Sequence, residues 1–298
     1  MNIREWGAAL LCTVIPGDEL TPLTLAQLRT LGARVRAMGR PAQPMNELRP
    51  EDLTAMGYPR HEAERIVALL DRESRLEQYL DRARDLGIYP LTRLSPEYPE
   101  RLRVLLGMNA PPILYAAGNA ELLNKPAVAV VGARDLREPG RGFCKAIGAL
   151  AAGEKRVLVS GNAVGADQTA QNACLDAGGC VVSFLADELS KHLPKESERQ
   201  ICLSAGGWDL PFTNARALQR NHFIHALGEK TFVAQCDSRK GGTWAGTVDN
   251  LSHGWSEVYC CDDGSPAMRE LCQRGGTPIP KTGLRSFDEA VPFQGNFF

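Results

Sequence analysis

A short apolar run at residues 127–131, Ala-Val-Ala-Val-Val, constrains the fold of this chain more than any other stretch. It ends in a Gly-Ala-Arg turn at 132–134, and after a helix-length segment a second run at 157–159 ends in a Ser-Gly-Asn turn at 160–162. Such alternation is typical of a parallel α/β sheet that is buried on both faces. Ligands of these sheets bind at the carboxyl ends of the strands, so we expect function in the small-residue turns.

The composition narrows the classes of protein that remain. The 298 residues, 44% of them hydrophobic, suffice for one large domain and a smaller one. A formal net charge of -1 argues against binding nucleic acid with the whole surface, so any anion site must be local. Nine cysteines without a CxxC pair, and no histidines at zinc-ligand spacing, indicate reduced thiols and no metal site. We expect a cytoplasmic protein without a membrane span.

The first 88 residues are predicted to form a small helical domain. Apolar residues recur there at helical spacing, as at Leu25 and Leu28, and turn clusters at residues 41–44 and 57–59 separate the expected helices. The segment 53–66 has two interpretations that stay open. It is either a hairpin between helices whose amides contact DNA phosphates, giving a SAM-like or helix-hairpin-helix-like domain for residues 1–88, or an ordinary turn of a helical bundle.

A domain boundary is expected at residues 89–94, where prolines replace the helical pattern. A core domain then covers residues 94–280, followed by a tail at 281–298. The tail after Thr277 shows no clear periodicity and is expected to be a loop or a partly ordered end. The stretch 110–118 predicts a short edge strand, since its prolines cannot donate ladder hydrogen bonds.

The core is predicted to be a doubly wound, mostly parallel sheet. Five strands are expected, at residues 127–131, 156–159, 180–185, 230–236 and 257–260. Helical segments are expected to begin near Arg141, Ala166, Lys195, Ala217, Thr243 and Ser265.

The turns after the first, second and fourth predicted strands should form one site, because the strand order of such sheets reverses beside the first strand. These turns lie at residues 132–134, 160–167 and 239–243. Their small residues allow a ligand to approach backbone amides, and each leads toward a helix start that attracts anions. Arg134 and Lys240 add full positive charges, so phosphate is the expected ligand chemistry.

No catalytic residue is assigned. The GxGxxG and GK[ST] nucleotide fingerprints are absent, and Ser160 lies outside a GxSxG pattern, without a histidine placed to activate it. Ser160 is therefore expected to bond backbone or phosphate. Asp167 is expected to complement the dipole of the helix that it begins. His222 and His225 are spaced to share a helix face but have no evident third metal ligand.

Arg220 and Asn221 precede an apolar helical run and either cap that helix or reach a phosphate. Base-stacking partners are less evident in the sequence, and the candidates are Phe184, Trp208 and Trp244.

Taken in order, these motifs resemble the DNA-processing protein A family (DprA, also called Smf), which has an extended Rossmann-like core. The resemblance covers about residues 94–279. It is carried by Val131-Gly132-Ala133-Arg134, by Ser160-Gly161-Asn162-Ala163-Val164-Gly165-Ala166-Asp167, by Arg220-Asn221-His222 before an apolar run, by Gly241-Gly242-Thr243, and upstream by Tyr98-Pro99 and Pro111-Pro112-Ile113-Leu114-Tyr115.

The resemblance implies a protein without catalysis or cofactor that binds single-stranded DNA, forms a homodimer and hands the strand to a RecA-type recombinase, as in natural transformation. Three departures suggest a divergent member: His222 replaces the last Arg of an RNR stretch, Gln171 replaces a His, and Leu193-Pro194 replaces Tyr-Pro. We also expect no winged helix after the core. The predicted DNA or phosphate site comprises Gly132, Ala133, Arg134, Ser160, Gly161, Asn162, Gly165, Arg220, Asn221, Lys240, Gly241, Gly242 and Thr243.

The alternative is a nucleotide-derivative sensor or an enzyme similar to the lysine-decarboxylase-like phosphoribohydrolases. The stretch 240–247 is similar to their PGGxGTxxE phosphate loop. However, aligning Gly246 and Thr247 with the GT of that loop places Asn250 where the catalytic glutamate is expected. Hydrolysis therefore ranks below DNA binding.

Overall fold

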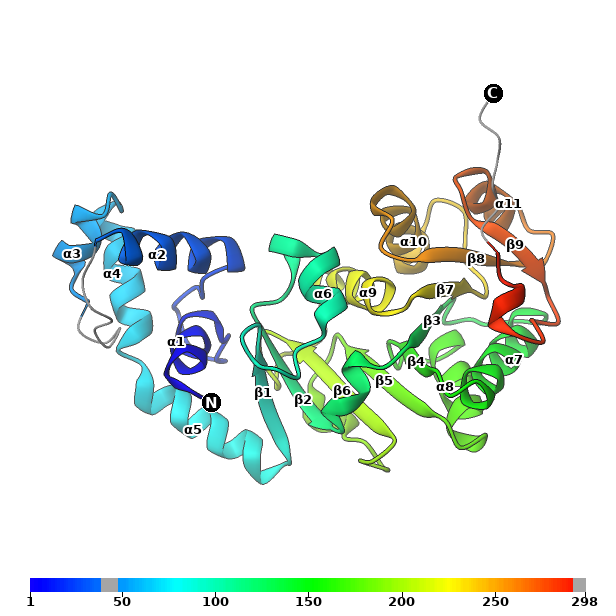
Figure 1. Cartoon of the computed structure of the whole chain (residues 1–298), viewed down its shortest axis with the longest axis horizontal. Coiled ribbons are helices and arrows are strands. Elements are labelled where there is room, and N and C mark those ends of the chain that lie inside the picture. The colour runs from blue at the N-terminus through cyan, green and yellow to red at the C-terminus, as the bar shows by residue number, and fades with distance from the viewer. Residues whose placement is uncertain (39–47, 292–298) are drawn as a thin grey trace.

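A single nine-stranded sheet forms the centre of the protein, whose computed structural model describes residues 1–38 and 48–291 (Figure 1). Across the sheet the strand order is β1-β2-β6-β5-β4-β3-β7-β8-β9. The strands span Ile88–Thr92 (β1), Ile113–Gly118 (β2), Ala127–Val131 (β3), Val157–Ser160 (β4), Cys180–Leu185 (β5), Gln200–Ala205 (β6), Lys230–Val233 (β7), Glu257–Asp262 (β8) and Thr277–Pro280 (β9).

Strand β3 lies at the point where the strand order reverses, as the sequence predicts. It pairs in parallel with β4 on one side and with β7 on the other. All pairs from β6 to β9 are parallel, whereas β2 is antiparallel to both of its neighbours, β1 and β6. The predicted fold class, a mostly parallel, Rossmann-like α/β sheet, is confirmed.

Helices cover both faces of this sheet, which explains why β3 is apolar on both sides: all five of its residues are buried. α7 and α8 pack on one face and contribute Phe143 and Ala170 to its core. α6, α9, α10 and α11 pack on the other face (Figure 1). These helices span Glu100–Leu105 (α6), Gly140–Gly153 (α7), Ala166–Asp176 (α8), Asn214–Leu227 (α9), Gly241–His253 (α10) and Pro266–Gln273 (α11).

The N-terminal region is helical, as expected, and packs against the β1 end of the sheet (Figure 1). Its helices span Ile3–Cys12 (α1), Leu25–Ala37 (α2), Pro50–Ala55 (α3), Arg60–Leu70 (α4) and Glu73–Asp85 (α5). Thr13 and Tyr115 of β2 share a hydroxyl–hydroxyl hydrogen bond of 2.9 Å, and the Tyr79 hydroxyl of α5 donates to Asp209 over 2.6 Å. The turn at 57–59 separates α3 from α4, and the turn cluster at 41–44 lies outside the described residues.

Four predictions about the sheet are wrong. Residues 200–205 form β6, where the expected helix near Lys195 would continue. β2 is an interior strand, between β1 and β6. Its place is compatible with the two prolines because Pro111 and Pro112 precede the strand and so remove no hydrogen bond from its ladder. The segment after Thr277 begins with β9, an edge strand that tolerates its two prolines. The fourth predicted strand ends at Val233 rather than at residue 236.

Strand β1 lies where the sequence predicts only a domain boundary. The division into residues 1–88, 94–280 and 281–298 stays a proposal. Within the described ranges, 1–38 and 48–291, no helix combines the length and the apolar character needed to cross a membrane.

Candidate functional site

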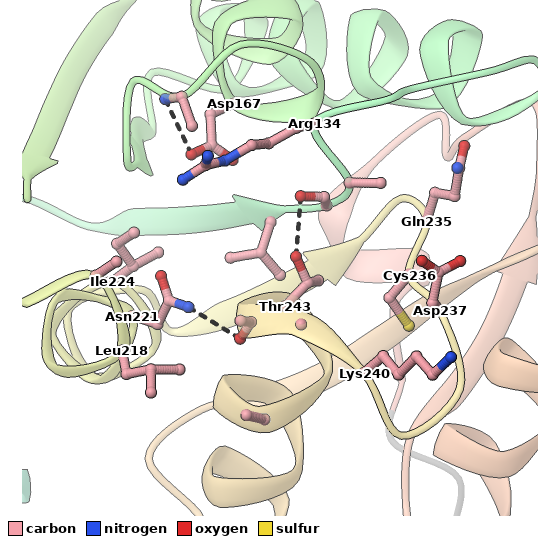
Figure 2. A pocket seen from close by; sticks show the side chains of 18 of the residues that line it. Arg134, Asp167, Leu218, Asn221, Ile224, Gln235, Cys236, Asp237, Lys240 and Thr243 are labelled. Carbon is pink, nitrogen blue, oxygen red and sulfur yellow. Dashed lines mark hydrogen bonds between the residues drawn. The ribbon is translucent and has the colours of Figure 1, made fainter. Parts of the chain in front are cut away.

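A cavity of about 770 Å³ opens at the carboxyl ends of β3 and β7, between α9 and the start of α10 (Figure 2). It lies at the strand-order reversal, where the sequence places the site. Nine of the thirteen predicted residues line it: Gly132, Ala133, Arg134, Arg220, Asn221, Lys240, Gly241, Gly242 and Thr243.

The turn after β3 supplies the first cation. The side chain of Arg134 is exposed, and its guanidinium lies 5.5 Å from the ring centroid of Phe212. No carboxylate within residues 1–38 and 48–291 pairs with it. The preceding Gly132 is held in place because its carbonyl accepts a 2.9 Å hydrogen bond from the Thr243 hydroxyl (Figure 2). This bond ties the turn after β3 to the start of α10.

The turn after β7 supplies the second cation and an open helix start. Lys240 is the N-cap residue of α10, is exposed, and has no ion-pair partner in the described parts of the chain. Its side chain does not cap the helix. The backbone N–H groups of Gly242 and Thr243 find no acceptor among the described residues and lie at the cavity. Unpaired amides at a helix start, beside a lysine, favour an anion.

The turn after β4 behaves differently from what the sequence suggests. Ser160, Gly161, Asn162 and Gly165 do not line the cavity. The buried Ser160 hydroxyl donates to the Val130 carbonyl over 2.7 Å, which joins β4 to β3. Ala163 and Asp167 of the same turn do line the cavity, whereas Ser160 supports the sheet beneath it.

The glycines of that turn make room for the chain itself. A Cβ at Gly161 would lie 0.9 Å from the Nη1 atom of Arg220, and one at Gly165 would lie 2.4 Å from the carbonyl oxygen of Ala133. Gly165 also has φ +97°, which disfavours any side chain. The expectation that all these glycines let a ligand reach the backbone is wrong for this turn.

The start of α8 is likewise closed to anions. The Asp167 carboxylate accepts a 3.3 Å hydrogen bond from the Ala163 N–H (Figure 2). The Ala166 N–H donates to the carbonyl oxygen of Ala133 over 3.1 Å. α7 is capped in the same way, since the Gly142 N–H donates to Glu138. Of the three helix starts predicted to attract phosphate, that of α10 is the one at which no carboxylate of the described residues is bound.

Arg220 and Asp167 form a buried ion pair at the base of the cavity. Their side chains approach to 3.3 Å and are each 9% exposed. Burial raises the pKa of Asp167 and lowers the pKa of Arg220, because both charged forms lose hydration. The Arg220 Nε–H has no partner among the described residues. Arg220 thus packs against the turn after β4, and Asp167 largely neutralises its positive charge.

α9 contributes two further groups. The Asn221 amide donates to the Gly242 carbonyl over 2.9 Å and so holds the α10 start against α9 (Figure 2). His225 is fully buried beside the cavity, and burial lowers its pKa to about 3, so it is neutral. His222 faces away and bonds Asp249 of α10 over 2.9 Å. The two histidines therefore have separate surroundings.

Phe212 is the functional candidate that the sequence analysis missed. It lines the cavity and is 43% exposed, beside Arg134. The proposed stacking residues are in the core instead: Phe184 packs on Phe223, Trp208 on Tyr79, and all three candidates are at least 92% buried. An aromatic residue after Pro211, in the loop between β6 and α9, was the available signal.

Four arginine and lysine side chains line the cavity. Its cations Arg137 and Arg220 are paired with Asp135 and Asp167, which leaves Arg134 and Lys240 as the cations without an anionic partner in the described chain. Asp237 at the rim lowers the net positive charge.

Asn250, the position at which the hydrolase alternative would require a glutamate, is fully buried and bonds Ser256, outside the cavity. Within the described residues, no three His, Cys, Asp or Glu side chains gather as metal ligands would.

The family model described as DNA recombination-mediator protein A matches residues 90–264. This chain belongs to that family. The match covers all three turns of the site, and so the predicted resemblance is confirmed.

The DNA processing protein DprA of Streptococcus pneumoniae is 32% identical over 142 residues, which cover 45% of this chain and 50% of that protein. The aligned part therefore spans about half of the relative's length.

Two solved structures share the fold. DNA processing protein A from Streptococcus pneumoniae superposes with a TM-score of 0.67 at 22% identity, covering 88% of this chain and 96% of the other. DNA processing protein A from Helicobacter pylori, whose structure concerns a single-stranded DNA binding mode, gives a TM-score of 0.56 at 20% identity, covering 68% and 93%.

Proposed function

We propose that this protein takes part in DNA processing by binding single-stranded DNA, without catalysis, at the cavity between β3, β7, α9 and α10. One observation carries the proposal: two exposed cations on separate strand ends, Arg134 and Lys240, flank the open start of α10. Guanidinium, ammonium and free amides are the groups that bind phosphodiesters.

The preference for a single strand follows from Phe212. A half-exposed ring beside a cation gives a flexible strand a face on which a base can stack, whereas bases inside a duplex are already stacked. The Helicobacter pylori relative, which has the same fold, was studied for its single-stranded DNA binding mode. This likeness supports the same ligand class here.

The proposal assigns no chemistry to the site. The Ser160 hydroxyl is buried and engaged by Val130, so it is not available as a nucleophile. Asn250 cannot act as a general acid. As part of the same proposal, the protein self-associates through its core and passes the strand to a RecA-type recombinase; family membership is the support for this step.

A titration with a fluorescently labelled single strand tests the binding proposal. We expect duplex DNA and mononucleotides to compete weakly and an unlabelled single strand to compete fully. Lys240→Glu should weaken binding about tenfold, since it replaces an attractive contact with a repulsive one. Lys125→Glu is the matched control, because Lys125 is exposed and precedes the opposite end of β3.

Two outcomes would contradict the proposal. Equal effects of the two substitutions would mean that the strand binds elsewhere. Full displacement by mononucleotides, or release of a free base from a nucleoside monophosphate, would favour the nucleotide sensor or hydrolase instead.

A further inference from the structure

A second group of cations lies where the helical N-terminal region meets the sheet. Arg29 comes from α2, Arg93 follows β1, and Arg103 belongs to α6; we call these three residues the arginine cluster. An Arg93 Nη2–H donates to the Arg103 carbonyl over 2.9 Å, and an Nη1–H of Arg29 points at the Met108 sulfur, 3.1 Å away. α2 packs on the 3-10 turn Gly107–Asn109, which contains Met108 and follows α6. Three separate segments therefore bring these charges together.

The arginine cluster has more positive charge than its surroundings balance. Glu100 pairs with Arg103 over 2.8 Å, and no other carboxylate in the described parts of the chain pairs with any of the three. Burial, together with the charges of Arg29 and Arg103, lowers the pKa of Arg93. The Nε–H groups of Arg93 and Arg103 find no acceptor within the described ranges. Three positive charges with one paired carboxylate give the cluster a net positive charge, which favours binding of a further anion.

The arginine cluster and the cavity lie at the same end of the sheet, the end at which β1 and the parallel strands have their carboxyl termini. β1 runs parallel to β6, since both are antiparallel to β2, and β6 through β3 are mutually parallel. Arg93 therefore follows the carboxyl end of β1, as Gly132 follows that of β3. Five strand spacings separate β1 from β3, which is about 24 Å along the edge.

From this placement we infer that the arginine cluster is a second phosphate-binding site, which holds the same single strand after it leaves the cavity. The inference rests on the proposed function of the cavity. A span of about 24 Å corresponds to several nucleotides, within the roughly 4–16 that single-strand binding folds cover. The exposed side chains of Leu94 and Val104 offer apolar surface for the bases beside the arginines. A strand held at both sites would bind more tightly by tethering than at either site alone.

The test compares strands of two lengths. A strand of about 4 nucleotides fills the cavity alone, whereas one of about 20 reaches the arginine cluster. Arg29→Glu is the informative variant, because Arg29 is exposed and its side chain donates, within the described residues, a single hydrogen bond, to the Met108 sulfur. We expect it to weaken binding of the long strand about fivefold and to leave the short strand unchanged. Thermal unfolding checks that the fold is intact.

Two control variants separate this inference from the proposed function. Lys240→Glu should weaken binding of both strands. Arg84→Glu should weaken binding of neither, because Arg84 is 77% exposed on α5, which precedes the amino end of β1. Unchanged affinity of Arg29→Glu for the long strand, while Lys240→Glu weakens both, would overturn the second site alone. Equal losses of affinity for the long strand in Arg29→Glu and Arg84→Glu would mean that only the net charge of the protein matters, and would also overturn the second site. If Lys240→Glu changes neither strand, the cavity proposal fails.

Discussion

The turns after β4 and β7 look alike in sequence and have different functions in the structure. Both are rich in glycine and lead into a helix, at α8 and at α10. In the β4 turn the chain places its own groups at the helix start: the Asp167 carboxylate accepts the Ala163 N–H, and the Ala133 carbonyl accepts the Ala166 N–H. In the β7 turn no group in the described chain does so, and Lys240 stays exposed. We call these the closed turn and the open turn.

The comparison shows what makes a glycine-rich turn available to a ligand. A glycine removes a steric barrier, but another part of the protein can occupy the freed space. At Gly161 that occupant is the Arg220 guanidinium, which in turn needs Asp167 beside it. The closed turn should therefore determine stability and the open turn affinity.

The largest effect should come from removing the carboxylate of the closed turn. Asp167→Ala leaves Arg220 as a buried charge without a partner, so we expect the free energy of unfolding to fall by about 3–5 kcal/mol. Lys240→Ala in the open turn should change it by less than about 0.5 kcal/mol, because its side chain is exposed. Urea unfolding measures both. Similar values for the two variants would remove the distinction between the turns.

A smaller effect separates the glycines of the two turns. Gly161→Ala should destabilise the fold by about 3 kcal/mol, because the new methyl group overlaps the buried Arg220 side chain. Gly241→Ala meets no atom within 4 Å, so only its φ of +79° is unfavourable and the cost should be about 1 kcal/mol. Denaturant midpoints compare the pair directly. A larger loss in Gly241→Ala than in Gly161→Ala would contradict the assignment of Gly161 to packing.

Local pattern predicted the centre of the sheet well. β3 and β5 have the predicted bounds, since a buried parallel strand needs an uninterrupted apolar run. β6 was missed because the charged loop before it has no strand signal, and its pairing with β2 and β5 is a tertiary contact. β9 has two prolines in four residues, which a propensity argument excludes although an edge strand tolerates them.

The location of the site in the fold could be predicted from the sequence, but the packing of its side chains could not. Strand-order reversal located Arg134, Lys240 and the three turns near one another. That Arg220 occupies the space above Gly161 could not be read from the sequence, because the two residues come from distant segments. The exposure of Phe212 depends on how its loop packs, which also has no local signal.

The salt dependence of single-strand binding tests the central claim most directly. If Arg134, Lys240 and the partly engaged Arg137 contact phosphates, the logarithm of the association constant should fall with the logarithm of salt concentration at a slope of about -2. Lys240→Gln should reduce the magnitude of that slope by about 0.7, and Lys125→Gln, at the exposed residue before the opposite end of β3, should leave it unchanged. A slope near zero, or one that Lys240→Gln does not alter, would contradict binding at the open turn.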